Sequence, residues 1–272
     1  MSGGAGRPLA RASLESMRLH PRVLARQPSG VMRTPAYYLP WLTPQGLACI
    51  LLLSNIEARF KSGHNQGPFR LDVVQHDADG TVVERHTVVL SDNVEIRELP
   101  LRPTSAGYGF VTVAGEGLYS DLYVTVGDSG YAATHGRGEF IERYPWRSRA
   151  ALAAVGKVLG AIGRVLPAFV RHQYVFVGAD TRLLVLLLNL SNVQNHLRLV
   201  LSDVGGGLPT ARVYRLPAMG ARLVDPAEFL PVPPAGTDLR RLRLEGTAWF
   251  NLYLVGVGPR GLAGPLSLMH VK

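Results

Sequence analysis

Short apolar runs, spaced about ten residues apart, recur along most of the chain and alternate with turn-forming residues. The dipeptide Asp79-Gly80 separates two of them as a tight hairpin turn would, because glycine tolerates positive φ. The runs of the first half lie at residues 47–53, 69–75, 81–90, 94–99, 109–113, 121–126 and 131–135. Many short strands without intervening helices predict an antiparallel β-sandwich.

Residues 144–172 depart from this pattern and predict the only long helix of the chain. Alanine and leucine, both good helix formers, are frequent, and no proline occurs at positions 149–165. Ser148 is the expected N-cap, and Pro167 is expected to end or kink the helix. Gly156 and Gly160 thin one side of this helix and would allow another backbone to approach closely.

Four basic residues of this segment follow one another at intervals of eight, seven and seven positions. Because seven positions are almost two helical turns, this spacing predicts one basic stripe along the helix, which would contact an anionic membrane or an acidic partner. The residues of the stripe are Arg149, Lys157, Arg164 and Arg171. Three interpretations compete: a connector packed between sheets, an interfacial helix on a bilayer, and a transmembrane span. Lys157 and Arg164 would be costly at mid-bilayer, which disfavours the span.

The apolar runs on the two sides of the helix repeat in the same order, which predicts an internal duplication. The matching pairs are 48–55 with 184–192, Leu99-Pro100 with Leu230-Pro231, Val111-x-Val113-x-Gly115 with Leu242-x-Leu244-x-Gly246, and 120–123 with 250–253. The predicted fold is therefore all-β, with two tandem immunoglobulin-like antiparallel β-sandwiches joined by one amphipathic α-helix. The predicted segments are a basic, arginine-rich arm at 1–35, a first sandwich at 36–143, the connecting helix at 144–172 and a second sandwich at 173–272.

Composition adds a constraint on the surface. Hydrophobic residues make up 47% of the chain and charged residues only 18%, which indicates that a partner or a membrane covers part of the surface. The net charge of +9 is uneven: residues 36–140 hold seven basic and twelve acidic residues, whereas 173–272 hold ten basic and six acidic. The first repeat is thus acidic and the second basic, which predicts a head-to-tail contact within or between chains.

Local motifs for catalysis are missing from the sequence. Gly205-Gly206-Gly207 lacks the lysine of a phosphate-binding loop, and neither Gly-x-Ser-x-Gly nor Cys-x-x-Cys nor His-x-x-x-His occurs. The single cysteine, Cys49, lies in an apolar run and is expected to be buried, which makes it a poor nucleophile. The sequence therefore favours a protein that is not an enzyme and predicts neither a cofactor nor a resident metal.

A candidate ligand site comes from aromatic, histidine and amide positions that the two repeats share. Aromatic side chains beside carboxylates or amides stack on sugars or bases, although sandwich cores use the same residues. The predicted site, in a cleft between the sandwiches, comprises Tyr123, Tyr253, His135, His270, Asp121, Asn251 and Trp249. Basic residues do not interleave with these aromatics, which disfavours nucleic acid as a partner.

The leading functional prediction is a non-enzymatic interaction or assembly protein. Its sandwiches would contact a protein partner or a second copy, and its arm and helix would dock on an anionic membrane surface or an acidic partner. The alternative is a small-ligand or carbohydrate-binding protein, with or without a metal. The expected location is cytoplasmic or membrane-peripheral, and the arm, which has no apolar signal region, also resembles a cleaved mitochondrial transit peptide in composition.

Overall fold

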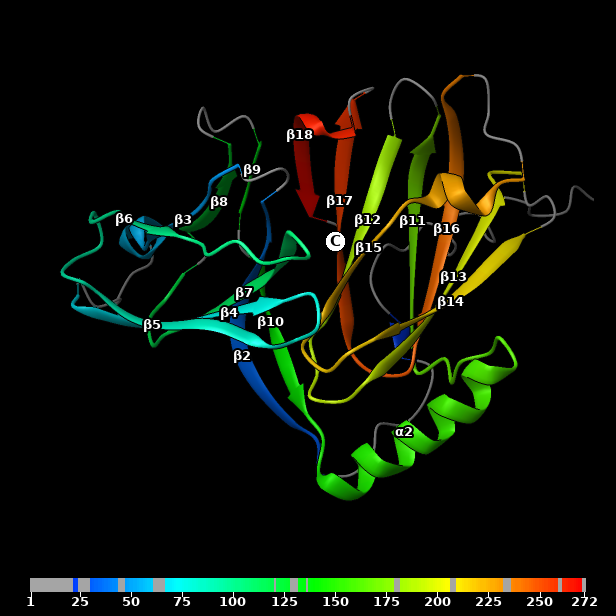
Figure 1. Ribbon diagram of the computed structural model, residues 1–272. Helices are drawn as coiled ribbons and strands as arrows, with labels where there is room; N and C mark the ends of the chain where they lie inside the picture. The colour runs from blue at the N-terminus through cyan, green and yellow to red at the C-terminus, as the bar shows by residue number, and fades with distance from the viewer. Residues whose placement is uncertain are drawn as a thin grey trace, which may run out of the picture.

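The computed structural model describes residues 22–23, 30–43, 47–60, 67–119, 121–127, 132–135, 137–178, 182–205, 209–231, 236–258 and 261–270. Within these residues the chain is mostly β, with several antiparallel sheets and one α-helix, so the all-β sandwich class is confirmed (Figure 1). The predicted arm lies mainly outside the described residues.

The first unit contains two antiparallel sheets whose strands follow the predicted apolar runs closely. Sheet 1a has the order β10-β2-β7-β4-β5, with bounds Arg137–Arg143, Met32–Leu42, Tyr108–Ala114, Phe69–Asp77 and Val82–Leu90. Sheet 1b has the order β6-β3-β8-β9, with bounds Arg97–Pro100, Cys49–Ser54, Asp121–Val126 and Ala132–His135. A short 3₁₀ helix, η2, follows β3 at Ile56–Phe60. Apolar side chains from both sheets fill the core between them.

The second unit repeats this arrangement. Sheet 2a has the order β1-β11-β16-β13-β14, with bounds Arg22–Val23, Phe169–Val177, Asp238–Gly246, Asn195–Asp203 and Thr210–Leu216. Sheet 2b has the order β15-β12-β17-β18, with bounds Ala221–Val224, Arg182–Asn189, Phe250–Gly258 and Gly261–His270. The 3₁₀ helix η3, Pro226–Phe229, covers one end of this sandwich and contributes Phe229 to its core.

The two units share one strand order, and it is not that of an immunoglobulin domain. If the eight strands common to both units are numbered along the chain, the sheets read 1-6-3-4 and 5-2-7-8 in each unit. An immunoglobulin domain instead pairs its strands as ABED and CFG. The described strands therefore do not have the order that the prediction of an immunoglobulin-like fold implies. Alternation along a strand specifies which face is buried but not which strand is its neighbour.

The edge strands link the units across the sequence. β1 precedes the first unit, yet it pairs with β11 of the second unit, through Arg22 with Val170 and Val23 with Phe169. β10 leads into the second unit, yet it pairs with β2 of the first. Each unit thus receives its outermost strand from the segment that precedes the other unit.

The outer face of sheet 1a packs directly on the outer face of sheet 2b. Tyr38 of β2 meets Tyr253 of β17 edge-to-face, with ring centroids 5.9 Å apart. The Asn251 side-chain amide donates to the Tyr38 hydroxyl, and the Tyr253 hydroxyl donates to the Tyr38 carbonyl oxygen at 3.3 Å. Sheet 2b is therefore buried on both faces, which is why β12 is an almost unbroken apolar run.

The helix is shorter than the predicted segment 144–172, and it begins before the predicted N-cap, Ser148. α2 spans Trp146–Ala161 and lies across one end of the second unit (Figure 1). Its N-cap is Pro145 and makes no side-chain cap hydrogen bond, so the prediction of Ser148 as the N-cap was wrong. A φ of 67° at Gly163 closes the C-terminal turn, well before Pro167.

We expect the paired positions Tyr253 and Tyr123 to differ sharply in their contribution to stability. Tyr253 is 0% exposed between the units, whereas Tyr123 is 42% exposed on sheet 1b. Tyr253→Ala should lower the free energy of unfolding by about 3–5 kcal/mol because it opens a cavity and removes two contacts to Tyr38. Tyr123→Ala should cost under about 1 kcal/mol. Urea unfolding of both variants measures this, and equal losses would contradict the packing described.

Candidate functional site

A groove runs along α2 where the helix crosses the ends of β13 and β14. It consists of two hollows of about 580 and 530 Å³ that share Ala153 and Gln194 as lining residues. One hollow lies toward the start of the helix, beside Asn192 and Pro217. The other lies beside Gly156, Gly160, His196 and Val213.

The groove is lined by three cations and, among the described lining residues, by no acidic side chain. Arg149 and Lys157 come from the helix, and Arg215 comes from the edge strand β14. All three are exposed, so their side chains are free to meet a ligand from solvent. Cations from two elements that face one concave surface favour an anionic partner.

The predicted basic stripe is only partly present. Arg149 and Lys157 lie on α2, and Arg164 is exposed just beyond the end of the helix. Arg171 instead lies in β11 and is 1% exposed. Its Nε donates to the Phe250 carbonyl oxygen at 3.2 Å, and its guanidinium lies over the Trp249 ring at 5.4 Å. Arg171 is therefore a core residue of the second unit and does not reach the surface that was predicted for it.

His196 explains the two glycines of the helix. A Cβ at Gly156 would lie 2.3 Å from His196 Nδ1, and one at Gly160 would lie 3.3 Å from its Cδ2. The imidazole thus occupies the place that was expected for a neighbouring backbone. His196 Nε2 lies 3.0 Å from the amide nitrogen of Gln194, and burial, together with the nearby Arg215, lowers the pKa of His196.

The opposite side of α2 presents apolar side chains to solvent. Only Leu152 and Gly156 are buried along the whole helix. Val155, Val158 and Ile162 lie three and four positions apart, so they share one outward face, and Val158 is 66% exposed. Trp146, at the start of the helix, is 71% exposed. Among the described residues, no helix is both long enough and apolar enough to cross a membrane.

The predicted ligand residues do not form one pocket. Tyr123 is on the open face of sheet 1b, whereas Tyr253 and Asn251 are buried against Tyr38. Trp249 packs edge-to-face on Phe169 within the second unit. The side chains of His135, His270 and Asp121 lie outside the described part of the structure. The backbone register nevertheless pairs Tyr123 with His135 and Tyr253 with His270.

A cavity does lie between the units, but other residues line it. It has a volume of about 490 Å³ and is floored by the outer face of sheet 1a, with two contributors from the second unit. Its polar and charged lining residues are Thr34, Asp72, His76, Arg85, Thr112, Arg143 and Asn192. Met219 closes one side with a φ of 55°, a strained value for a residue other than glycine. No group of three or more potential metal-binding side chains occurs among the described residues.

Cys49 lies buried in β3, as the sequence predicted. Burial raises the pKa of its thiol to about 12, so the thiolate form that a nucleophile needs is strongly disfavoured.

Sequence reasoning missed a basic surface of the second unit, the outer face of sheet 2a. The inward residues of β13 and β16, such as Leu199 and Leu244, fill the core of the second unit, so the alternating positions face outward. Those positions carry Arg198, Arg241 and Arg243. The alternation of arginine with leucine in Arg241-Leu242-Arg243-Leu244 was the available signal.

Comparisons with protein-family models, with curated protein sequences and with solved structures find no match to this chain.

We expect Gly156→Ala to destabilise the protein and Gly160→Ala to leave it unchanged or slightly more stable. Alanine gains about 1 kcal/mol over glycine in a helix. At position 156 the new methyl group would collide with the buried His196 ring, and overpacking costs about 1–3 kcal/mol, so a net loss of up to about 2 kcal/mol is expected. Urea midpoints provide the measurement. A Gly156→Ala variant as stable as Gly160→Ala would show that the helix does not press on His196.

Stability should fall in acid because of His76. Burial lowers the pKa of His76 from 6.5 to about 4, so the folded state binds fewer protons than the unfolded state. The stabilising effect is complete above pH 6.5 and is lost as the pH falls through about 4, with a total of about 3 kcal/mol. His76→Gln should flatten this part of the stability–pH curve in denaturant titrations. An unchanged slope in the variant would exclude His76 as the cause.

Proposed function

We propose that this chain is a non-enzymatic docking protein, located at the membrane periphery, that binds an anionic membrane surface through α2. The observation that carries the proposal is the outward apolar face formed by Val155, Val158 and Ile162. A helix that only connects two sandwiches would turn polar side chains to water and bury its apolar ones. This helix instead leaves most of its apolar side chains exposed, because it buries only Leu152 and Gly156.

The charges at and near the helix support an anionic partner. Arg147, Arg149, Lys157 and Arg164 are exposed at or near the helix, and no acidic residue occurs in the sequence between Glu142 and Asp180. Apolar side chains would enter the boundary between headgroups and acyl chains while the cations contact lipid phosphates. Each cation near an anionic leaflet contributes about 1 kcal/mol. The N-terminal arm, with six arginines and one acidic residue in positions 1–35, would add to the same attraction.

The two units supply the protein–protein contacts of this function. Their common strand order, and the like pairings of Tyr123 with His135 and Tyr253 with His270, support an origin by internal duplication. A duplicated unit that already recognises its own copy within the chain offers the same surfaces to other proteins.

The alternative function, binding of a small ligand, draws its support from the cavity between the units. The strained backbone of Met219 and the buried His76 beside Arg85 and Arg143 are features that binding sites share. This cavity replaces the predicted cluster of tyrosines and histidines as the place to test for ligands.

We expect the protein to co-sediment with phosphatidylserine–phosphatidylcholine vesicles at low salt, and to bind pure phosphatidylcholine vesicles weakly. Lys157→Glu together with Arg164→Glu should weaken binding to the anionic vesicles at least about tenfold, because two attractive charges become repulsive. Val158→Asp together with Ile162→Asp should weaken it similarly and should also remove the salt-resistant part of the binding.

The matched control reverses two exposed arginines away from the helix, Arg102→Glu and Arg222→Glu, and leaves the net charge equal to that of the first double variant. The control should bind almost as well as the natural sequence. An equal loss of vesicle binding in the control would show that binding depends only on net charge. Absence of binding to every vesicle would make α2 a structural connector and overturn the proposal.

A further inference from the structure

Within one chain, two of the four outer sheet faces are already used. The outer face of sheet 1a packs on the outer face of sheet 2b, through Tyr38 and Tyr253. The outer faces of sheets 1b and 2a are left toward solvent, as the exposed Tyr123 and Phe176 show. Because the strand orders of the units match, sheet 2a corresponds to sheet 1a and sheet 1b corresponds to sheet 2b. The two open faces are therefore counterparts of the two faces that bind each other.

The open face of sheet 2a carries arginines at positions where its counterpart has an apolar, an uncharged polar and an acidic residue. The matched runs Val111-x-Val113 and Leu242-x-Leu244 place Arg241 at the position of Phe110 and Arg243 at the position of Thr112. The strand pairings extend this match. Val73 pairs with Val113 in the first unit and Leu199 pairs with Leu244 in the second, so Leu199 corresponds to Val73 and Arg198 corresponds to Asp72. The only described acidic residue on this face of β16 is Glu245, which Arg198 and Arg243 both contact.

The open face of sheet 1b has changed in the opposite sense. Leu52 pairs with Tyr123 on one side and with Glu98 on the other. Its counterpart Leu186 pairs with Tyr253 on one side and with Leu223 on the other. Glu98 therefore stands where the buried interface has Leu223, and its side chain is exposed.

The acidic and the basic positions would face each other if two copies packed in the way that the two units pack within one chain. β15, which carries Leu223, lies against β7, which carries Phe110 and Thr112. The corresponding strands are β6, with Glu98, and β16, with Arg241 and Arg243. A contact of the same geometry between copies would thus bring an acidic residue onto two arginines.

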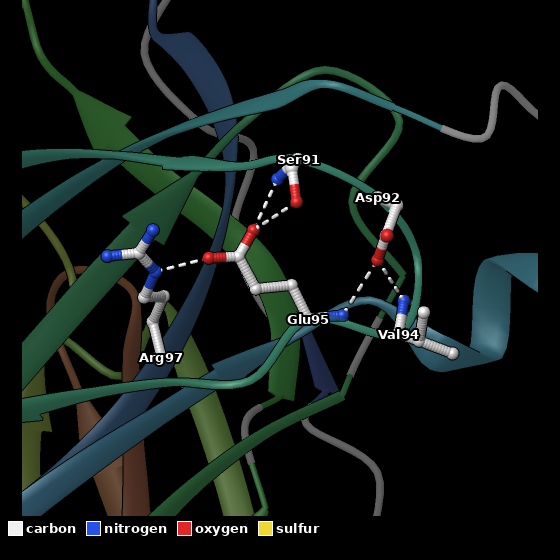
Figure 2. Close-up of polar contacts among 5 residues, drawn as sticks. All are labelled: Ser91, Asp92, Val94, Glu95 and Arg97. Carbon is white, nitrogen blue, oxygen red and sulfur yellow. Dashed lines mark hydrogen bonds and ion pairs between the residues drawn. The ribbon is translucent and has the colours of Figure 1, made fainter.

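The edge of sheet 1b beside Glu98 is held in a defined shape. In the turn before β6 the Glu95 carboxylate accepts hydrogen bonds from the amide and hydroxyl of Ser91 and pairs with Arg97, while Asp92 accepts from the amides of Val94 and Glu95 (Figure 2). The hydrogen bonds from Ser91 and the pairing with Arg97 keep the pKa of Glu95 at about 2. The turn displays Val94 and Ile96, and the face of sheet 2a displays Phe176 and Leu239, so both faces offer exposed apolar side chains.

We infer that a second copy of this chain docks the outer face of its sheet 1b on the outer face of sheet 2a, in the arrangement that sheets 1a and 2b adopt within the chain. Glu98 of one copy contacts Arg241 and Arg243 of the other. The interface joins two different surfaces, so the assembly is head-to-tail and grows into a ring or an open filament. The proposed function includes protein–protein contacts through the sandwich faces, and the inference identifies their partner as a second copy of the chain. It rests on that part of the proposed function and not on the membrane contact of α2.

Sedimentation-velocity centrifugation over a range of protein concentrations tests the inference. The natural sequence should form dimers and larger species that dissociate as salt is raised. Glu98→Arg alone, and Arg241→Glu together with Arg243→Glu, should each weaken association at least about tenfold, because like charges then face each other. Mixing the two variants should restore association, because the unaltered Glu98 face of one variant meets the unaltered arginine face of the other. Combining the three substitutions in one chain should also restore self-association, because the two reversed faces are again complementary, and a structural defect in either face would prevent this.

Two exposed charges outside both faces provide the control: Glu116→Arg and Arg222→Glu should leave association unchanged. A monomeric natural protein at all concentrations, or a mixture that stays dissociated, would overturn the inference. The variants Glu98→Arg and Arg241→Glu with Arg243→Glu should still bind anionic vesicles, and the Lys157→Glu and Arg164→Glu variant should still self-associate. Failure of membrane docking and failure of assembly are therefore separable.

Discussion

The burial of sheet 2b on both of its faces is the constraint on which the remaining structure depends. Its inner residues, such as Val185 and Leu252, complete the core of the second unit, and its outer residues, such as Leu186 and Val255, complete the core that contains the first unit. A sheet that is apolar on both faces cannot be left half in water. The first unit is therefore the cover of this sheet, and Tyr38 fixes its position through Tyr253 and Asn251.

This arrangement leaves α2 outside the main cores. The helix touches the second unit at the start of β13, where His196 fits against Gly156, and its remaining surface faces outward. The apolar residues of that surface do not contribute to the packing of the described residues, and the proposed function assigns them an external contact. The same reasoning applies to the open sheet faces, where the charged residues Glu98, Arg241 and Arg243 stand at positions that are apolar or uncharged in the internal interface.

Sequence patterns predicted the strands well, because alternation and turn residues are local properties. The strand predicted at 121–126 has those bounds, and Asp79-Gly80 lies in the turn between β4 and β5. Matches between the repeats were less secure where the motif was short. Leu99-Pro100 was matched with Leu230-Pro231, but the strand pairings align Leu99 with Val224. Loop lengths differ between the units, and only the hydrogen-bonded register corrects for them.

The sequence by itself determined the β-rich class, the presence of a helix after residue 145, the burial of Cys49 and the basic character of residues 143–172. These follow from periodicity, composition and local propensity, which act within a few residues. Tertiary structure alone decided that Arg171 enters a core, that Tyr253 is covered while Tyr123 is open, and that the arginines of β14 and β16 share surfaces with other elements. Such outcomes depend on which strands become neighbours, and strands far apart in sequence are brought together only by the burial of their shared apolar faces.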